Sequence, residues 1–143
     1  IADNLLVYQL EDSPITMTIP NNVIGTIQKL PMLKNGENGY LLGGYNAKRT
    51  AIYVTNAISR INAENQMKTI RLMSKGIVDY LGNVCISSEG INNLPPHCQE
   101  NIVYMAQSKN IDTNNPLVAI IAPNGNVQFA LYIGKEFVPF YKI

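Results

Sequence analysis

The chain has 143 residues and a mass of 15.8 kDa, the size of one ordinary domain, so we expect a single domain over residues 1–143. Hydrophobic residues make up 46% of the sequence and charged residues 15%, a composition that supports a packed core and argues against a disordered chain. Eleven Lys and Arg residues against ten Asp and Glu residues leave a net charge of +1. This balance excludes a protein held to nucleic acid mainly by charge, and we expect no nucleic-acid partner.

The N-terminal third predicts β-structure. Residues 4–10 form an apolar run, and residues 15–19 alternate between apolar side chains and threonine, as a half-buried strand does. Residues 23–33 fit a short helix that Pro31 breaks, and residues 40–45 fit a strand loosened by two glycines.

The middle of the chain predicts helices. Apolar residues between positions 51 and 84 recur at helical spacing, and charged residues occupy the opposite face. We interpret this pattern as one long amphipathic helix over residues 48–83, or as two helices joined near residues 62–63. The charged face is expected to be solvated. A further helix is expected to begin near residues 93–96, where prolines occupy the first turn, and to run through Ser108.

The C-terminal third predicts three more strands. Residues 117–122 form a continuous apolar run, an Asn-Gly pair typical of hairpin turns follows, and residues 127–133 then alternate. The last strand covers residues 137–143, where Pro139 lacks a backbone donor and places the strand at a sheet edge. The predicted fold class is therefore α+β, with N-terminal strands, two to three central helices, a C-terminal three-stranded antiparallel meander and one disulfide.

The two cysteines, Cys85 and Cys98, predict where the protein works. A minimal even count is typical of one disulfide in an oxidising compartment, and the alternative is a pair of buried thiols in a reduced protein. The chain begins with Ile1 rather than Met, so we expect a processed or truncated N-terminus, which leaves room for a signal peptide or membrane anchor before Ile1. None of the eighteen Asn residues begins a glycosylation sequon. We therefore expect an exported protein of the bacterial periplasm or cell surface.

Residues with catalytic or metal-binding chemistry are scarce. The single histidine and the two cysteines are too few for a zinc site, and a disulfide consumes both thiols, so we expect no metal and no cofactor. A hydrolase that uses Ser87 or Ser88 with His97 is a third-ranked hypothesis, but the sequence has no Gly-x-Ser-x-Gly motif. We expect a non-enzymatic protein. Any membrane association is expected through an anchor before Ile1, because no apolar run approaches the ~20 residues of a membrane-spanning helix.

Two segments are candidate surfaces for a protein partner. Residues 86–97 form a turn-rich loop that the disulfide would close and preorganise for docking, although a plain connection between helices is an alternative. Residues 137–143 form an aromatic, apolar strand that is either covered by protein or open to strand addition. The predicted contact residues are Ile91, Leu94 and His97 in the loop and Phe137, Phe140 and Tyr141 in the strand.

The run Pro96-His97-Cys98 beside the disulfide loop resembles the periplasmic inhibitors of vertebrate lysozyme, which present a histidine on a disulfide-closed loop. The resemblance covers three residues, and the cysteine spacing is wider in this chain. Our leading hypothesis is a non-enzymatic extracytoplasmic interaction domain, an accessory or assembly partner of a bacterial envelope or membrane-anchored complex. The alternative is an inhibitor or immunity protein that blocks a cell-wall-degrading enzyme with the loop 86–97.

Overall fold

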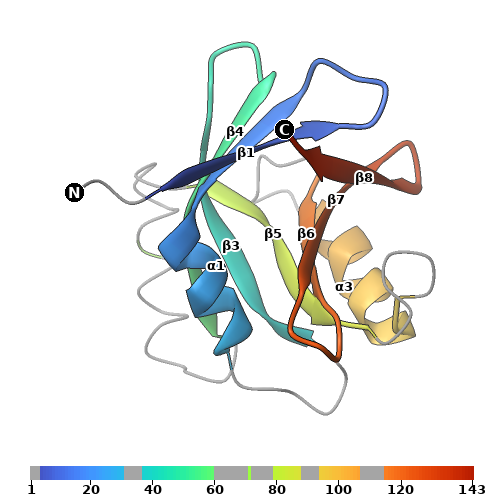
Figure 1. The fold of residues 1–143 in the computed structure, drawn as a ribbon. Helices are drawn as coiled ribbons and strands as arrows, with labels where there is room; N and C mark the ends of the chain where they lie inside the picture. The colour runs from blue at the N-terminus through green and yellow to red at the C-terminus, as the bar shows by residue number, and fades with distance from the viewer. Residues whose placement is uncertain (1–3, 31–36, 60–70, 72–78, 88–93, 107–114) are drawn as a thin grey trace.

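Eight strands close into a β-barrel in the computed structural model (Figure 1), which describes residues 4–30, 37–59, 71, 79–87, 94–106 and 115–143. The elements in chain order are β1 (Leu5–Leu10), β2 (Thr16–Pro20), α1 (Asn21–Gln28), β3 (Glu37–Tyr45), β4 (Ala51–Ser59), β5 (Asp79–Ile86), α3 (Pro96–Ala106), β6 (Leu117–Ile121), β7 (Val127–Ile133) and β8 (Glu136–Lys142). The predicted α+β class is therefore wrong, because the N-terminal strands and the C-terminal meander belong to one closed sheet.

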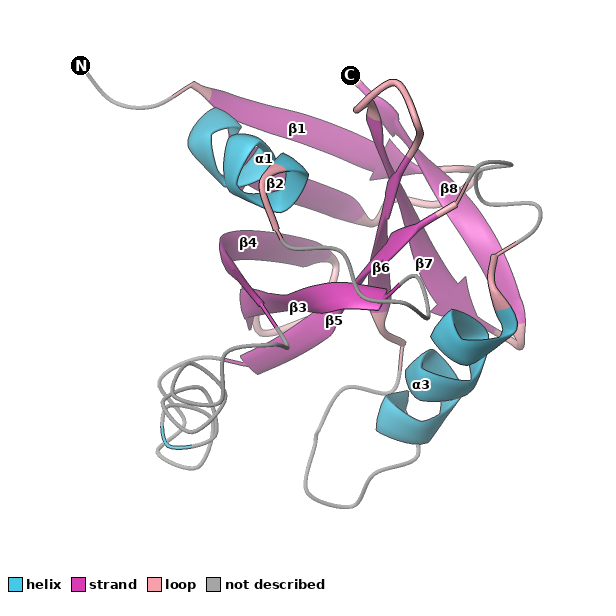
Figure 2. Cartoon of the chain, turned by 90° about the horizontal axis from the view of Figure 1, so that it is seen from below, coloured by secondary structure: helices cyan, strands magenta, loops and turns pink. Residues whose placement is uncertain are grey.

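The strands follow the order β1-β2-β4-β3-β5-β6-β7-β8, and β8 pairs with β1 to complete the barrel. Neighbours run antiparallel except β2 beside β4 and β5 beside β6, which run parallel. Figure 2 shows the two described helices at separate places around the barrel. No end of the sheet is left without a neighbouring strand.

The predicted helix over residues 48–83 is wrong at both of its ends, which form β4 and β5. In β4, Val54 pairs with Gly43 and Asn56 pairs with Leu42, so Thr55 is an extra, bulged residue. The bulge brings Val54 and Ala57, three positions apart, into the same core. Buried residues three positions apart are also what one turn of a helix would give, so at this bulge the strand departs from strict alternation. Residues 60–70 and 72–78 of the predicted helix lie outside the described residues.

The edge position predicted for the last strand is also wrong, because β8 has a neighbour on each side. It pairs with β7 from Glu136 to Pro139, and with β1 from Phe140 to Lys142. Pro139 lies just past the last pair between β1 and β8, and its carbonyl accepts the N–H of Glu11 at 3.0 Å. Pro139 has no backbone N–H to donate, and it therefore stands where the pairing between β1 and β8 ends.

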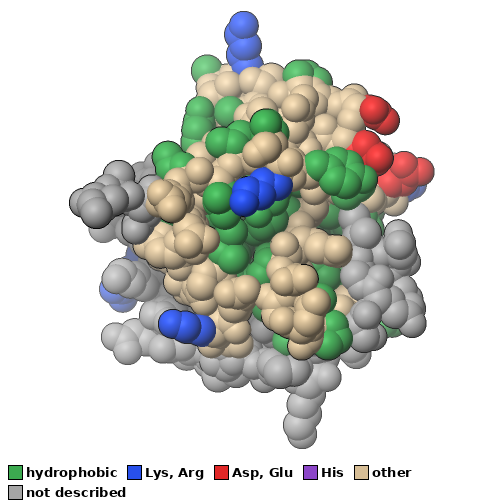
Figure 3. Space-filling view, in the orientation of Figure 1, with side chains coloured by type: hydrophobic (Ala, Val, Ile, Leu, Met, Phe, Trp, Pro, Cys, Tyr) green, Lys and Arg blue, Asp and Glu red, His purple; other side chains and the backbone are tan. Residues whose placement is uncertain are grey.

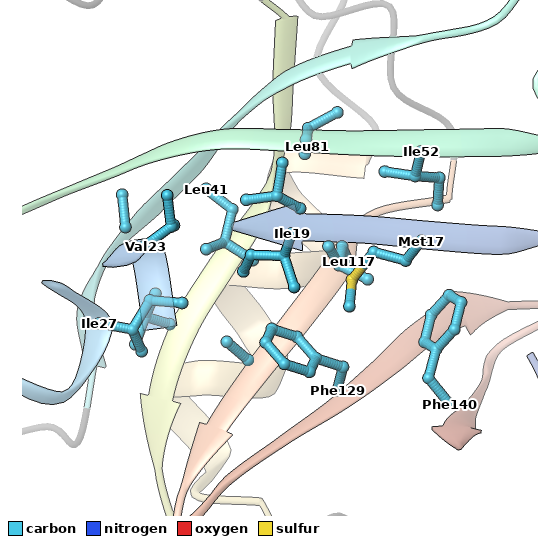
Figure 4. Close-up of a cluster of buried hydrophobic side chains, with 14 of the residues drawn as sticks. Met17, Ile19, Val23, Ile27, Leu41, Ile52, Leu81, Leu117, Phe129 and Phe140 are labelled. Carbon is cyan, nitrogen blue, oxygen red and sulfur yellow. The ribbon is translucent and has the colours of Figure 1, made fainter. Parts of the chain in front are cut away.

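The barrel interior holds the main hydrophobic core (Figure 4). Helix α1 follows β2 directly and buries Val23 and Ile27, one helical turn apart, in this core. The side chain of Gln28 donates to the carbonyl of Gly125 in the β6–β7 turn at 2.8 Å, so α1 closes this end of the barrel. Tyr8 meets Phe129 edge to face at 5.2 Å between ring centres, and burial raises the pKa of Tyr8.

A second hydrophobic cluster lies outside the barrel wall, under α3. Alternate residues of β6 divide between the two cores, so the strand is buried on both faces. The members of the second cluster are Cys85, Leu94, Cys98, Ile102, Val118, Ile120 and Ala130. The predicted disulfide joins Cys85 at the end of β5 to Cys98 in the first turn of α3, with a Cα–Cα distance of 6.4 Å. The bond anchors α3 to β5, and both of its cysteines are fully buried in the second cluster.

Substitution of Gly82 by alanine is expected to destabilise the barrel, because a Cβ at this position would lie 1.6 Å from the carbonyl oxygen of Leu117 on β6. Relief of this clash requires β5 and β6 to move apart, at a cost of about 1–3 kcal/mol or more. The matched control is Gly25→Ala in α1, where a Cβ meets nothing within 4 Å. This change should stabilise the helix by about 0.5–1 kcal/mol. Urea denaturation measures both, and equal stabilities for the two variants would contradict the close approach of β5 to β6.

Removal of the disulfide in the double variant Cys85→Ala/Cys98→Ala is expected to lower the free energy of unfolding by about 3 kcal/mol, because the cross-link restricts the unfolded chain. Denaturation with and without dithiothreitol measures the effect. The reductant should destabilise the wild-type chain and leave the double variant unchanged. A wild-type midpoint that does not respond to complete reduction would contradict a stabilising role for the bond.

Candidate binding face

Large hydrophobic side chains gather on one outer face of the barrel. Six large hydrophobic residues of the described chain are exposed, and five of them lie on β1, on β4 or at the end of β8. We call these five residues the apolar face: Leu5, Val7, Tyr53, Tyr141 and Ile143. The sixth, Tyr104, lies on α3. Figure 3 shows hydrophobic side chains gathered on the visible side of the molecule, with acidic side chains at one border.

Strand register makes the apolar face continuous. Val7 on β1 pairs with Thr18 on β2, and Thr18 pairs with Tyr53 on β4. On the other side of β1, the N–H of Ile143 donates to the carbonyl of Val7 at 3.0 Å. Paired residues of neighbouring strands point to the same side of a sheet, about 5 Å apart. Ile143, Val7, Thr18 and Tyr53 therefore form one row across four strands.

The remaining two members extend this row along the strands. Leu5 lies two positions before Val7 and so shares its side of β1. Tyr141 lies two positions before Ile143 and pairs with Gln9 of β1. The apolar face thus covers β8, β1, β2 and β4, with polar Gln9 and the threonines of β2 between its apolar side chains.

The exposure of these side chains has a geometric cause. Leu6, Tyr8 and Leu10 alternate with the outward residues of β1 and pack against the interior core. A closed barrel has one interior, so the apolar residues on the other side of such a strand stay outside unless another element covers them. Tyr53 is 44% exposed, and its partners across the strands, Thr18 and Gly44, are too small to cover its ring.

An acidic turn borders the apolar face. The hydroxyl of Tyr141 donates to Oε1 of Glu11 at 3.4 Å, and Asp12 follows in the same exposed turn. The negative charge of Glu11 raises the pKa of Tyr141, because it disfavours the phenolate. Tyr141 therefore keeps its proton, which it donates to Glu11, and its hydroxyl oxygen can accept a hydrogen bond at the edge of the face.

The three predicted contact residues of the last strand lie in three different surroundings. Tyr141 is exposed and belongs to the apolar face. Phe140 faces the interior core and is 7% exposed. Phe137 is half-buried and packs beside the second cluster, with its ring centre 5.0 Å from that of Tyr132. Alternation along β8 places Phe140 inside the barrel and the other two outside, where Phe137 packs beside the second cluster and Tyr141, four positions further, stands beside β1.

Of the predicted contact residues of the loop 86–97, the side chain that the structure describes is that of Leu94. Leu94 is buried in the second cluster, at 2% exposure. His97 lies in the first turn of α3, and its side chain is outside the described residues, as is Ile91. Ser87 of the hydrolase hypothesis is buried, and Ser88 lies outside the described residues. The inhibitor and hydrolase hypotheses therefore gain no support from this region.

Four members of the apolar face were missed from the sequence. Leu5 and Val7 carry a usable signal, because a strand that is apolar at odd and even positions must expose one side unless both sides are covered. Ile143 follows by the same alternation from Tyr141. Tyr53 was missed because residues 51–59 were interpreted as helix. In a helix, consecutive residues do not alternate between two sides as they do in a strand.

Neither a group of metal ligands nor a membrane-spanning helix is found in the part of the chain that the structure describes. No three His, Cys, Asp or Glu side chains of the described residues group as metal ligands would. Among these residues, no helix combines the length and the apolar character that a membrane span requires.

Comparison with known proteins places the chain in no established family. No family model matches the sequence, and no curated protein is significantly similar to it.

Proposed function

We propose that the chain is a non-enzymatic extracytoplasmic protein-interaction domain, an accessory or assembly partner of a bacterial envelope or membrane-anchored complex. The observation that carries this proposal is the apolar face. Contiguous exposed apolar surface rimmed by polar residues is typical of protein-interaction sites. Two of its five residues are tyrosines, a residue type that often contributes a large share of binding energy in interfaces.

The disulfide supports the extracytoplasmic part of the proposal. Disulfides persist in oxidising compartments and are rare in the reducing cytosol. The Cys85–Cys98 bond joins two fully buried residues inside a packed cluster, as a structural disulfide does. A location in the periplasm or at the cell surface is consistent with a structural disulfide.

The composition of the apolar face suggests what kind of partner surface fits it. Threonine and Gln9 interrupt the apolar side chains, so the partner is expected to present an apolar patch with a few polar groups. The acidic turn with Glu11 and Asp12 lies beside Tyr141 at one border. A Lys or Arg of the partner at this border would give electrostatic complementarity and would speed association.

Substitution of Tyr53 by lysine is expected to weaken partner binding by about tenfold or more, because it places a charge within an apolar contact. Immobilised wild-type and variant chains would be incubated with envelope extract, and bound proteins would be quantified by mass spectrometry. The matched control is Tyr104→Lys, which makes the same change at an exposed tyrosine of α3, outside the apolar face. Both variants should keep the wild-type melting temperature.

The proposal predicts a protein that the wild-type chain and Tyr104→Lys retain and that Tyr53→Lys loses. Equal retention of every bound protein by the two variants would exclude the apolar face as the binding surface. A catalytic turnover by the purified chain that survives Tyr53→Lys would overturn the non-enzymatic part.

The oxidation state of the cysteines in cells tests the proposed extracytoplasmic location. Cells that express the chain from its native gene would be quenched in acid, and free thiols would be alkylated before any reductant is added. An extracytoplasmic protein should show no alkylation of Cys85 or Cys98 until dithiothreitol is present. Complete alkylation without reductant would place the protein in a reducing compartment.

A further inference from the structure

A small cavity opens at the end of the barrel opposite α1. Its volume is about 110 Å³, and the described residues that line it are Ile15, Tyr45, Arg49, Ile52, Asn115 and Leu131. They come from the start of β2, the turn between β3 and β4, and the segments around β6 and β7. The mouth of a β-barrel is a common place for a ligand site.

Three aliphatic side chains and one cationic side chain are among the residues that line the cavity. Ile52 and Leu131 belong to the interior core, and Ile15 packs against it. Arg49 is exposed, and its guanidinium carbon lies 4.9 Å from the centre of the Tyr45 ring. Arg49 is the charged member of the described lining, so the electrostatic field at the mouth favours an anion.

The turn that carries Arg49 is held in place by hydrogen bonds. Oδ1 of Asn46 accepts the backbone N–H groups of Thr50 at 2.8 Å and Ala51 at 3.0 Å. The backbone N–H of Arg49 donates to the Asn46 carbonyl at 3.0 Å, and Thr16 of β2 donates to the Thr50 carbonyl at 2.9 Å. These bonds fix the base of the arginine side chain beside the cavity before any ligand arrives.

Arg49 occupies a backbone conformation that favours glycine, with φ at +55°. Asp12 and Lys135 adopt the same region in other turns, so this conformation belongs to the turn and is not by itself a sign of a binding site. The position therefore carries an arginine where the turn alone would favour glycine or asparagine.

We propose that this cavity binds a small monocarboxylate whose apolar group is no larger than a benzene ring. The apolar group would lie between Ile52 and Leu131, and the carboxylate would accept hydrogen bonds from Arg49. An enclosed apolar cavity of ~150 Å³ holds benzene, so a cavity of about 110 Å³ with an open mouth suits a group of this size or smaller. The planar guanidinium matches a carboxylate in geometry and charge.

Neighbouring groups are compatible with this assignment. Arg49 takes part in other interactions, and a guanidinium has five N–H donors, so it can form more than one hydrogen bond. Glu11 and Asp12 lie on the adjoining turn and do not line the cavity. The site is separate from the apolar face and does not depend on the proposed function.

Titration of the full chain with benzoate tests the proposal directly. Methyl resonances of Ile52 and Leu131 should shift and saturate with a dissociation constant of about 1 mM or lower. Benzamide, which has the same ring and no charge, should bind at least about tenfold more weakly, because a hydrogen bond to a charged group is lost. Absence of saturable shifts with benzoate, or equal binding of benzamide, would overturn the proposal.

Two substitutions of Arg49 separate binding from folding. Arg49→Gln should weaken benzoate binding by about tenfold or more. Its matched control, Lys48→Gln, removes the adjacent exposed charge of the same turn and should bind as the wild-type chain does. Arg49→Gly removes the charge and relieves the positive φ, so it should lose binding without any fall in melting temperature. Wild-type affinity in both Arg49 variants would exclude this residue as the carboxylate-binding group.

Discussion

Closure of the sheet is the constraint on which the rest of this structure depends. The pairing of β1 with β8 joins the two ends of the sheet, and Gln9 stands beside Tyr141 in that register. Closure gives every strand two neighbours, so the side chains of each strand divide between one interior and one exterior. The interior is filled by the main core. The outward side chains are covered in one region of the barrel and exposed in another.

Two outer regions of the barrel show this difference. On β5, β6 and β7, α3 covers the outward residues, and the Cys85–Cys98 disulfide anchors the helix over them. On β8, β1, β2 and β4, the residues of the apolar face remain exposed. The same alternation of side chains therefore produces a second core in one region and an uncovered surface in the other. This contrast supports the proposal that a partner protein covers the apolar face.

Alternation also separates the apolar face from the cavity at the mouth. Ile52 and Tyr53 are consecutive residues of β4, yet Ile52 lines the cavity and Tyr53 is exposed on the outer side. Arg49 is placed by the turn before this strand rather than by the strand itself. The two sites therefore share a structural element without sharing side chains.

The sequence alone determined the features that depend on local chemistry. Strict alternation predicted β2, prolines predicted the start of α3, and the Asn-Gly pair predicted the β6–β7 turn. The cysteine count predicted the disulfide, and the aromatic last strand included one residue of the candidate face, Tyr141. The strand, helix and turn signals follow from backbone preferences within a few residues, and the disulfide follows from the presence of two cysteines in the whole chain.

Only the tertiary structure decided the barrel, the apolar face and the cavity. The bulge at Thr55 gives β4 the spacing of a helix, and only its pairing with β3 shows that it is a strand. Val7, Thr18 and Tyr53 are far apart in the sequence, and strand register alone places them in one row. Such long-range pairings depend on which strands meet when the sheet closes, and no local pattern in the chain encodes that choice.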